Sequence, residues 1–210
     1  MLGDSLGFRL VLPKGRLLEK SLALAKLLCV SEVDGKRLSF KRDDLFVALA
    51  KQKDIPALIE NGIFDAGMMC GEWVAECKDC CPHVVRAFET DWCDTRICLI
   101  GTSGAFESRP EGRPLSCVTE FPNVARKYLD DIGYRDTEIH VVSGSTEAFV
   151  PYLFDVAIDC VETGETVRAN GLTVLDEIMC AKSSFCVRSS GRREETFSKY
   201  IKLIEACIND

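Results

Sequence analysis

The stretch Val156-Ala157-Ile158-Asp159-Cys160-Val161, followed by Glu162-Thr163-Gly164-Glu165-Thr166, determines how this chain is interpreted. Its apolar first half predicts a buried strand, and a helical pattern begins near Thr166. Gly164 lies in the turn between them, where a residue without a Cβ lets the backbone approach an anion closely. N–H groups at the helix start and two threonine hydroxyls add donors, so the turn is typical of a monophosphate site.

Asp159 lies near the carboxyl end of the same strand, where a carboxylate can accept hydrogen bonds from the hydroxyls of a sugar. Taken alone, the Thr163-Gly164-Glu165-Thr166 pattern is also typical of a plain strand-to-helix turn with a capping threonine. Both interpretations of this segment remain open at this point.

A second candidate anion site is Pro13-Lys14-Gly15-Arg16, between an apolar run at 8–12 and a helical pattern that starts at Leu17. Lysine supplies a point charge and arginine a planar fork for phosphate oxygens. Two such cations at one strand-to-helix turn can hold a pyrophosphate. Solvated surface charge is the alternative.

Strands and helices alternate along the chain. Further strands are predicted at 46–49, 66–69, 97–100, 117–119 and 138–142, and further helices begin near Asp54, Pro122 and Glu194. This order predicts parallel βαβ units and a doubly wound α/β architecture. Breaks at 91–95 and 175–182 predict two domains, one of residues 1–93 plus 179–210 and one of residues 94–178. Ligands of open α/β sheets bind at the carboxyl ends of strands, so we expect a cleft between the halves.

Bulk composition excludes several classes of function. The 210 residues carry a formal net charge of −7, which disfavours a nucleic-acid partner because such affinity rests on Lys and Arg. The first twelve residues lack the pattern of a signal peptide, and no apolar run approaches the roughly 20 residues that cross a bilayer. We therefore expect a cytoplasmic protein with no membrane partner.

Twelve cysteines are present, and in a chain without an export signal they are expected to be reduced thiols. Four of them lie in strand-like apolar runs and are expected to pack as small hydrophobes: Cys98, Cys117, Cys160 and Cys186. The segment from Cys77 to His83 has ligand types that zinc uses, but no second knuckle of similar spacing follows. We therefore favour loop and packing cysteines and predict no metal site made by protein ligands.

With these segments placed, the chain resembles the ATP phosphoribosyltransferases of histidine biosynthesis. The resemblance runs from about Leu10 to Ser184 in the family's order, and the ordered set is far more specific than any single piece. The matching pieces are Leu12-Pro13-Lys14-Gly15-Arg16, Asp54-Ile55-Pro56, Glu60-Asn61-Gly62, Asp65-Ala66-Gly67, Phe121-Pro122-Asn123-Val124-Ala125-Arg126 with Tyr128, Gly144-Ser145 with Glu147, and Asp155 through Thr166 with Asn170-Gly171-Leu172.

The resemblance implies two doubly wound α/β domains like those of type II periplasmic binding proteins, with the active site in the interdomain cleft. The implied reaction joins ATP to phosphoribosyl pyrophosphate and releases pyrophosphate, with Mg²⁺ bound mainly through substrate phosphates. The length of the chain is similar to the short form of the family, which often works with a regulatory subunit similar to histidyl-tRNA synthetase. A homodimer is also expected.

The resemblance also implies roles for particular residues. Lys14 and Arg16 are the expected catalytic residues. The expected phosphoribosyl pyrophosphate site comprises Glu147, Asp159, Glu162, Thr163, Gly164, Glu165 and Thr166. The expected ATP site comprises Lys14, Arg16, Lys51, Gly67 and Gly71.

Three positions depart from the family pattern. Cys70 ends a Gly67-Met68-Met69-Cys70 run where the family commonly has Gly-Ile-Val-Gly, Lys51 replaces an arginine, and Cys93 replaces a glycine. The phosphoribosyl half therefore matches better than the ATP half. Two alternatives follow: a non-catalytic clam-shell module that binds a phosphorylated small molecule, and a phosphoribosyltransferase with a different acceptor.

Overall fold

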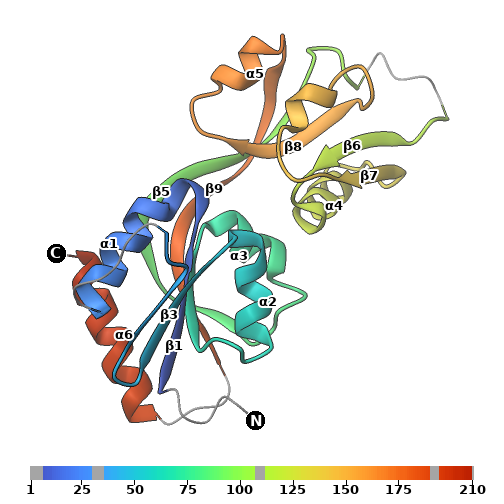
Figure 1. The fold of residues 1–210 in the computed structure, drawn as a ribbon. Helices are drawn as coiled ribbons and strands as arrows, with labels where there is room; N and C mark the ends of the chain where they lie inside the picture. Colours follow the sequence, from blue (N-terminus) through green and yellow to red (C-terminus); the bar gives the residue numbers. More distant parts are fainter. Residues whose placement is uncertain (1–6, 30–35, 107–111, 190–193, 210) are drawn as a thin grey trace. The chain divides into compact units, whose positions relative to one another are not determined.

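The computed structural model describes residues 7–29, 36–106, 112–189 and 194–209, and the chain divides into two compact units (Figure 1). Unit 1 comprises residues 1–93 and 182–210, and unit 2 comprises residues 94–181. Two long strands, β5 (Val84–Gly101) and β9 (Thr173–Arg188), carry the chain from one unit to the other. The sequence placed the return to the first unit at residue 179, close to the division at 182.

Unit 1 contains a mixed sheet with strand order β2-β3-β1-β4-β9. Its first four strands are β1 (Phe8–Pro13), β2 (Ser39–Arg42), β3 (Leu45–Ala50) and β4 (Ala66–Met69). β1 is parallel to both β3 and β4, as the alternation of strands and helices predicted, whereas β2 and β9 are antiparallel to their neighbours. The carboxyl ends of β1, β3 and β4 therefore lie at one edge of the sheet.

Helices cover both faces of this sheet. They are α1 (Leu18–Cys29), α2 (Ile55–Glu60), α3 (Gly71–Cys77) and α6 (Glu194–Asn209), with short 3₁₀ turns η1 (Gly15–Leu17) and η2 (Gln52–Asp54). Along β1, Leu10 and Leu12 pack in the core beneath α1 and α6, which contact each other (Figure 1), while Val11 packs against α2. Successive side chains of a strand point to opposite faces, so a strand covered on both faces reads as a continuous apolar run.

Unit 2 contains the strand order β5-β8-β6-β7, with β6 (Leu115–Thr119), β7 (Thr137–Val141) and β8 (Val156–Val161). β6 is parallel to β7 and β8, and β5 is antiparallel to β8. The helical elements are α4 (Pro122–Asp131), the 3₁₀ turn η3 (Thr146–Phe149) and α5 (Glu165–Ala169). The expectation of an α/β fold is confirmed for both units.

The two faces of β8 have different environments. Val156 and Ile158 pack in the core that includes Leu129 of α4, whereas Ala157 and Val161 pack in a second core. Asp159 shares the face of Ala157 and Val161, because side chains alternate along a strand. This face is the one that η3 and α5 cover, so the strand directs its only carboxylate toward them.

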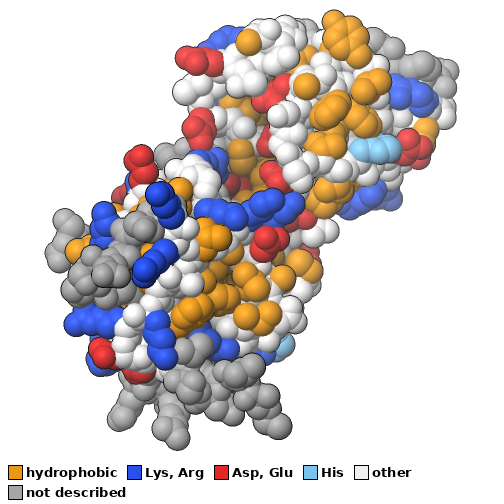
Figure 2. All heavy atoms as spheres, viewed as in Figure 1, with side chains coloured by type: hydrophobic (Ala, Val, Ile, Leu, Met, Phe, Trp, Pro, Cys, Tyr) orange, Lys and Arg blue, Asp and Glu red, His pale blue; other side chains and the backbone are white. Residues whose placement is uncertain are grey.

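Hydrophobic side chains are also exposed on unit 2, where Figure 2 shows them gathered beside a histidine. The most exposed large ones are Tyr152 and Leu153, at 89% and 70%. Both follow η3 and are not among the residues that line the pocket described below. Among the described residues, no helix is long and apolar enough to span a membrane.

Candidate anion-binding sites

A pocket of about 480 Å³ lies in unit 2 beside the carboxyl end of β8. This volume is within the range of small-molecule sites. Its lining comes from the loop before η3, from η3, from β8 and from α5: Gly144, Ser145, Glu147, Ala148, Asp159, Cys160, Thr166 and Asn170. The pocket thus adjoins the turn where the sequence predicted a sugar phosphate to bind.

Asp159 is held firmly in this pocket. It is 9% exposed, and its Oδ2 accepts a hydrogen bond of 2.7 Å from the hydroxyl of the buried Thr146. Its Oδ1 accepts a hydrogen bond of 2.7 Å from the backbone N–H of Cys160. A carboxylate has about four lone-pair positions. Asp159 is therefore a fixed acceptor suited to neighbouring hydroxyls of a sugar.

The turn before α5 offers backbone donors. Gly164 has a φ of +72°, at which a residue with a side chain would be strained. A Cβ built there would also lie 3.1 Å from Nη1 of Arg168. The Glu165 N–H donates to the Thr163 hydroxyl oxygen over 3.3 Å. The N–H groups of Thr166 and Val167 are in the first turn of α5 and have no acceptor within the helix. Because α5 has five residues, its dipole is small, and the donors themselves are what this turn provides.

The structure brings together some of the expected phosphoribosyl-site residues. Glu147, Asp159 and Thr166 line the pocket, whereas Glu162, Thr163 and Gly164 form the adjoining turn, Glu165 begins α5, and none of these four is part of the lining. Gly144 and Ser145 line the pocket as well, with φ of +82° and +56°; the sequence had marked them only through the family resemblance. Cys160 and Asn170, also in the lining, fall within matching pieces of the resemblance but were not assigned to the site, and Cys160 was expected only to pack as a small hydrophobe. Ala148 in the lining, and Thr146, which fixes Asp159, were missed.

The expected ATP-site cations gather at one edge of the unit 1 sheet. Lys14 directly follows β1, Arg16 lies in η1 two residues later, and Lys51 directly follows β3. The Lys14 N–H donates to the carbonyl of Ala50 over 2.8 Å, which joins the two strand ends. Gly71 follows the third parallel strand, β4, as the first residue of α3. This edge is where open α/β sheets bind ligands.

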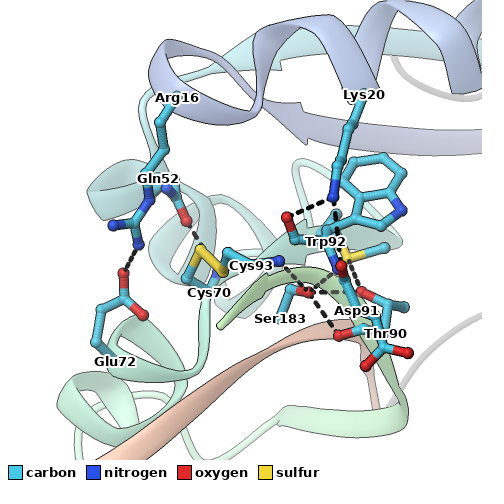
Figure 3. The surroundings of a disulfide bond; sticks show 11 residues. Arg16, Lys20, Gln52, Cys70, Glu72, Thr90, Asp91, Trp92, Cys93 and Ser183 are labelled. Atoms are coloured by element: carbon cyan, nitrogen blue, oxygen red, sulfur yellow. Dashed lines mark hydrogen bonds and ion pairs between the residues drawn. A yellow bond between two sulfur atoms is a disulfide. The ribbon is translucent and has the colours of Figure 1, made fainter. Parts of the chain in front are cut away.

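Arg16 forms an ion pair with Glu72 of α3 (Figure 3). Glu72 is 1% exposed, and the Arg16 side chain is 33% exposed. The guanidinium has five N–H donors in a planar fork, so a buried carboxylate can orient it while it still carries donors for a phosphate. Sequence reasoning missed Glu72, because a partner 56 residues away leaves no local pattern.

Gly67 has a packing reason for lacking a side chain. It is buried in β4, and a Cβ there would lie 2.7 Å from Cγ1 of Val11 and 3.0 Å from Cγ2 of Ile55. Contacts this short require the neighbours to move. The close approach of β1, β4 and α2 therefore accounts for this glycine without a ligand.

Cys70 and Cys93 form a disulfide, which corrects the expectation that the cysteines are all reduced thiols. The two residues are 23 positions apart, and they meet only because β5 passes the end of β4. They are also two of the three positions that depart from the family pattern.

The buried thiols behave as the sequence predicted for packing cysteines. Burial raises the pKa of Cys77, Cys81, Cys117 and Cys186 to about 12, so these groups remain protonated at neutral pH. Within the described ranges, no group of three or more His, Cys, Asp or Glu side chains is arranged to hold a metal ion.

Comparisons with known proteins agree with the fold and show a family. The family model of HisG, ATP phosphoribosyltransferase, matches residues 51–208. The ATP phosphoribosyltransferase of Thermotoga neapolitana is 32% identical over 206 residues, which cover 96% of each chain. That of Lachnoclostridium phytofermentans is 29% identical over 177 residues, covering 80% of this chain and 81% of the relative.

Among solved structures, the ATP phosphoribosyl transferase (HisG:HisZ) complex from Thermotoga maritima contains a chain with a TM-score of 0.82 and 26% identity. The match covers 96% of this chain and 98% of that one. These similarities identify the class of protein as an enzyme that transfers phosphoribosyl groups. More particularly, this chain belongs to the ATP phosphoribosyltransferase family.

Proposed function

We propose that this chain joins ATP to phosphoribosyl pyrophosphate, giving phosphoribosyl-ATP and pyrophosphate in the first step of histidine biosynthesis. Membership of the family gives the activity, and one observation connects it to these residues. The unit 2 pocket places the fixed carboxylate of Asp159 beside Glu147 and Thr166.

In this proposal unit 2 binds the phosphoribosyl group. The 5-phosphate binds at the turn of Thr163 to Thr166, where backbone N–H groups and hydroxyls donate. Asp159 and Glu147 accept hydrogen bonds from the ribose hydroxyls. Arg168, close to Gly164, offsets part of the charge that the phosphate brings next to carboxylates.

Unit 1 is proposed to bind the nucleotide and the pyrophosphate. Arg16 and Lys14 contact the leaving pyrophosphate or the ATP triphosphate, and Lys51 adds a third positive charge at the same edge. Glu72 orients the Arg16 fork through their ion pair. Gly71 gives the nucleotide access to the backbone at the start of α3.

The chemistry needs few protein groups. The acceptor nitrogen of adenine carries a lone pair and no proton, so no general base is required to create the nucleophile. What the protein supplies is alignment of two anionic substrates and stabilisation of the negative charge on departing pyrophosphate. A guanidinium and two ammonium groups at one edge provide this stabilisation.

The residues also fit Mg²⁺, which proteins usually hold through one or two carboxylates together with substrate phosphates. Glu147 and Asp159, which line the same pocket, are the carboxylates that would contribute. When bound, the ion neutralises phosphate charge.

We further propose that the chain works in the cytoplasm as a homodimer with a regulatory subunit of the HisZ type; the solved structure from Thermotoga maritima is a HisG:HisZ complex. The similarity covers 98% of the matched chain of that complex, which supports the same kind of assembly.

The two-substrate reaction tests the proposal directly. The purified protein with ATP, phosphoribosyl pyrophosphate and Mg²⁺ should develop a new ultraviolet absorbance as adenine is alkylated. Asp159→Asn should reduce the rate, and omission of either substrate should abolish the signal. If absorbance stays constant even with a HisZ-type subunit added, the chain is a binding module instead, and activity with another nucleotide only would indicate a different acceptor.

A further inference from the structure

We propose that Cys70 and Cys93 are a reversible redox modification site, and that their disulfide weakens the binding of ATP at the edge of unit 1. The effect on ATP rests on the proposed function, whereas formation of the bond does not. Both residues belong to unit 1.

The two cysteines differ in their environments. Cys70 follows β4, caps the start of α3 and is fully buried. Cys93 lies in β5 and is partly exposed. Their Cα atoms are 6.7 Å apart, within the range that disulfides span. Cys93 is therefore the sulfur that an external reagent reaches.

The backbone around each cysteine is held by hydrogen bonds that do not involve sulfur (Figure 3). The Cys70 N–H donates to Oε1 of Gln52 over 2.9 Å. On β5, the N–H groups of Trp92 and Cys93 donate to the Ser183 hydroxyl over 2.9 and 3.2 Å, and Lys20 Nζ donates to the Trp92 carbonyl over 2.7 Å. These contacts keep the two sulfurs close when the bond is open, so that it can close again.

The pair is directly connected to the residues proposed to bind ATP. Gln52, which accepts from Cys70, follows Lys51 in the chain, and Glu72, which pairs with Arg16, is two residues after Cys70. A cross-link from residue 70 to β5 fixes the start of α3. Glu72 lies at this start and orients the Arg16 guanidinium, which has to adjust its position to contact the triphosphate. Because the cross-link restricts Glu72, we expect the cross-linked form to bind ATP less well.

The redox step is a thiol–disulfide exchange with a low-molecular-weight disulfide such as oxidised glutathione. The Cys93 thiolate attacks one sulfur of the oxidant, forms a mixed disulfide and releases one thiol. The Cys70 thiolate then attacks the Cys93 sulfur and releases the second thiol. Two protein thiols have lost two protons and two electrons, and the oxidant has become two thiols; excess thiol reverses the steps.

The first measurement follows the bond alone. The full chain is equilibrated with mixtures of oxidised and reduced glutathione, alkylated, digested without reductant and examined by mass spectrometry. We expect a peptide linked through Cys70 and Cys93 in oxidising mixtures and both cysteines alkylated in reducing ones. A chain that never forms this linkage, or that keeps it in excess reduced glutathione, overturns the proposal.

The second measurement is the dissociation constant for ATP by titration calorimetry, which does not require turnover. We expect oxidation to raise the dissociation constant for ATP by about fivefold or more, which is a usual size for coupling between two sites. The dissociation constant for phosphoribosyl pyrophosphate should not change. Cys93→Ser should bind ATP like the reduced wild type in both redox conditions. Cys180→Ser, which removes an exposed cysteine outside the disulfide, should keep the wild-type response.

Equal ATP affinity in the two redox states, or no ATP binding in either, overturns the coupling to ATP. If the chain binds ATP in a redox-dependent way but forms no phosphoribosyl-ATP, the redox coupling is supported and the proposed reaction is contradicted. The two failures are therefore distinguishable.

Discussion

In unit 1, Asp65 precedes β4 and accepts hydrogen bonds from the backbone N–H and the guanidinium of Arg9, at 2.8 Å each. In unit 2, Asp155 precedes β8, accepts a 2.8 Å hydrogen bond from the Ser116 N–H and pairs with Arg113. Each aspartate thus fastens a strand to its parallel neighbour at the amino ends. The two units are therefore built alike at the amino ends of these strands.

At the opposite, carboxyl edge the two units use different chemistry. Unit 2 presents short groups fixed by near neighbours, such as Asp159 held by Thr146. Unit 1 presents long cationic side chains, of which Arg16 is oriented by Glu72. Rigid short groups suit a sugar phosphate of one shape, and long cations suit a flexible polyphosphate. Substitutions at the unit 2 pocket should therefore affect phosphoribosyl pyrophosphate, and substitutions at the unit 1 edge should affect ATP.

The largest effect is expected for Gly164→Val. A valine at φ +72° is strained and its Cβ meets Arg168, so the turn shifts and its N–H groups no longer face the phosphate. We expect kcat/KM for phosphoribosyl pyrophosphate to fall by about a hundredfold or more, with ATP affinity retained. Gly133→Val is the matched control: it has a φ of +92° and no neighbour within 4 Å, and lies outside the pocket. If both variants retain wild-type kinetics, the turn has no part in binding.

Arg16→Ala should produce the next largest change, at the other edge. Loss of a charge-assisted contact to phosphate is expected to lower kcat/KM for ATP by about tenfold to a hundredfold. Arg16→Lys should recover part of this, because it keeps the charge and loses the planar fork. Steady-state kinetics with each substrate varied in turn measure this change. If Arg16→Ala lowered kcat/KM for phosphoribosyl pyrophosphate alone, the assignment of ATP to the unit 1 edge would be contradicted.

Asp155→Asn tests the fastening of unit 2. Burial opposes ionisation of this carboxyl, but the hydrogen bonds from Ser116 and Arg113 and the charge of Arg113 outweigh it and hold its pKa below the ordinary value of an aspartate. The unfolded chain therefore binds the proton more readily, so the stabilisation is complete above about pH 4 to 5 and is lost as pH falls through the folded pKa. We expect Asp155→Asn to lower the free energy of unfolding at pH 7 by about 1 to 3 kcal/mol and to flatten its decline in acid.

Thermal or urea denaturation between about pH 7 and pH 2.5 measures this change. Asp131→Asn serves as the control, because Asp131 forms an exposed ion pair with Lys127 and should change stability by less than about 0.5 kcal/mol. Equal losses in the two variants would remove the special role of Asp155.

The smallest effect is expected for Thr146→Val, which removes one hydroxyl with little change in shape. Asp159 would lose a buried hydrogen bond, and the KM for phosphoribosyl pyrophosphate should rise by about three- to tenfold while that for ATP stays constant. Thr137→Val, on β7 and outside the pocket, should leave both unchanged. A rise in the KM for ATP alone would contradict the assignment of the pocket.

Several elements could be predicted closely because their signals are local. The apolar runs of β4 and β8 gave the observed bounds, and the Asp54-Ile55-Pro56 start preceded α2. β5 was predicted only at 97–100, although it begins at Val84, because its polar residues near Asp91 have the composition of a break. β2 was missed, since only Phe40 of its residues is buried.

The residues of the candidate sites also separate into those that a local pattern could predict and those that it could not. The Asp159 strand and its turn are contiguous, and the resemblance supplied Glu147, so the sequence could nominate them. The contacts of Glu72 with Arg16 and of Gln52 with Cys70 depend on where separate strands end, which no local pattern encodes. The Cys70–Cys93 pairing was missed for the same reason.

Every residue that lines the unit 2 pocket lies between positions 144 and 170, whereas the unit 1 edge gathers residues from Lys14 to Glu72. One short stretch of gene therefore carries the whole pocket, and a single recombination event can transmit or delete it intact. The unit 1 edge has no such stretch. Its residues are spread over a longer part of the gene, so single substitutions can change the acceptor side gradually while the sugar-donor pocket is inherited unchanged.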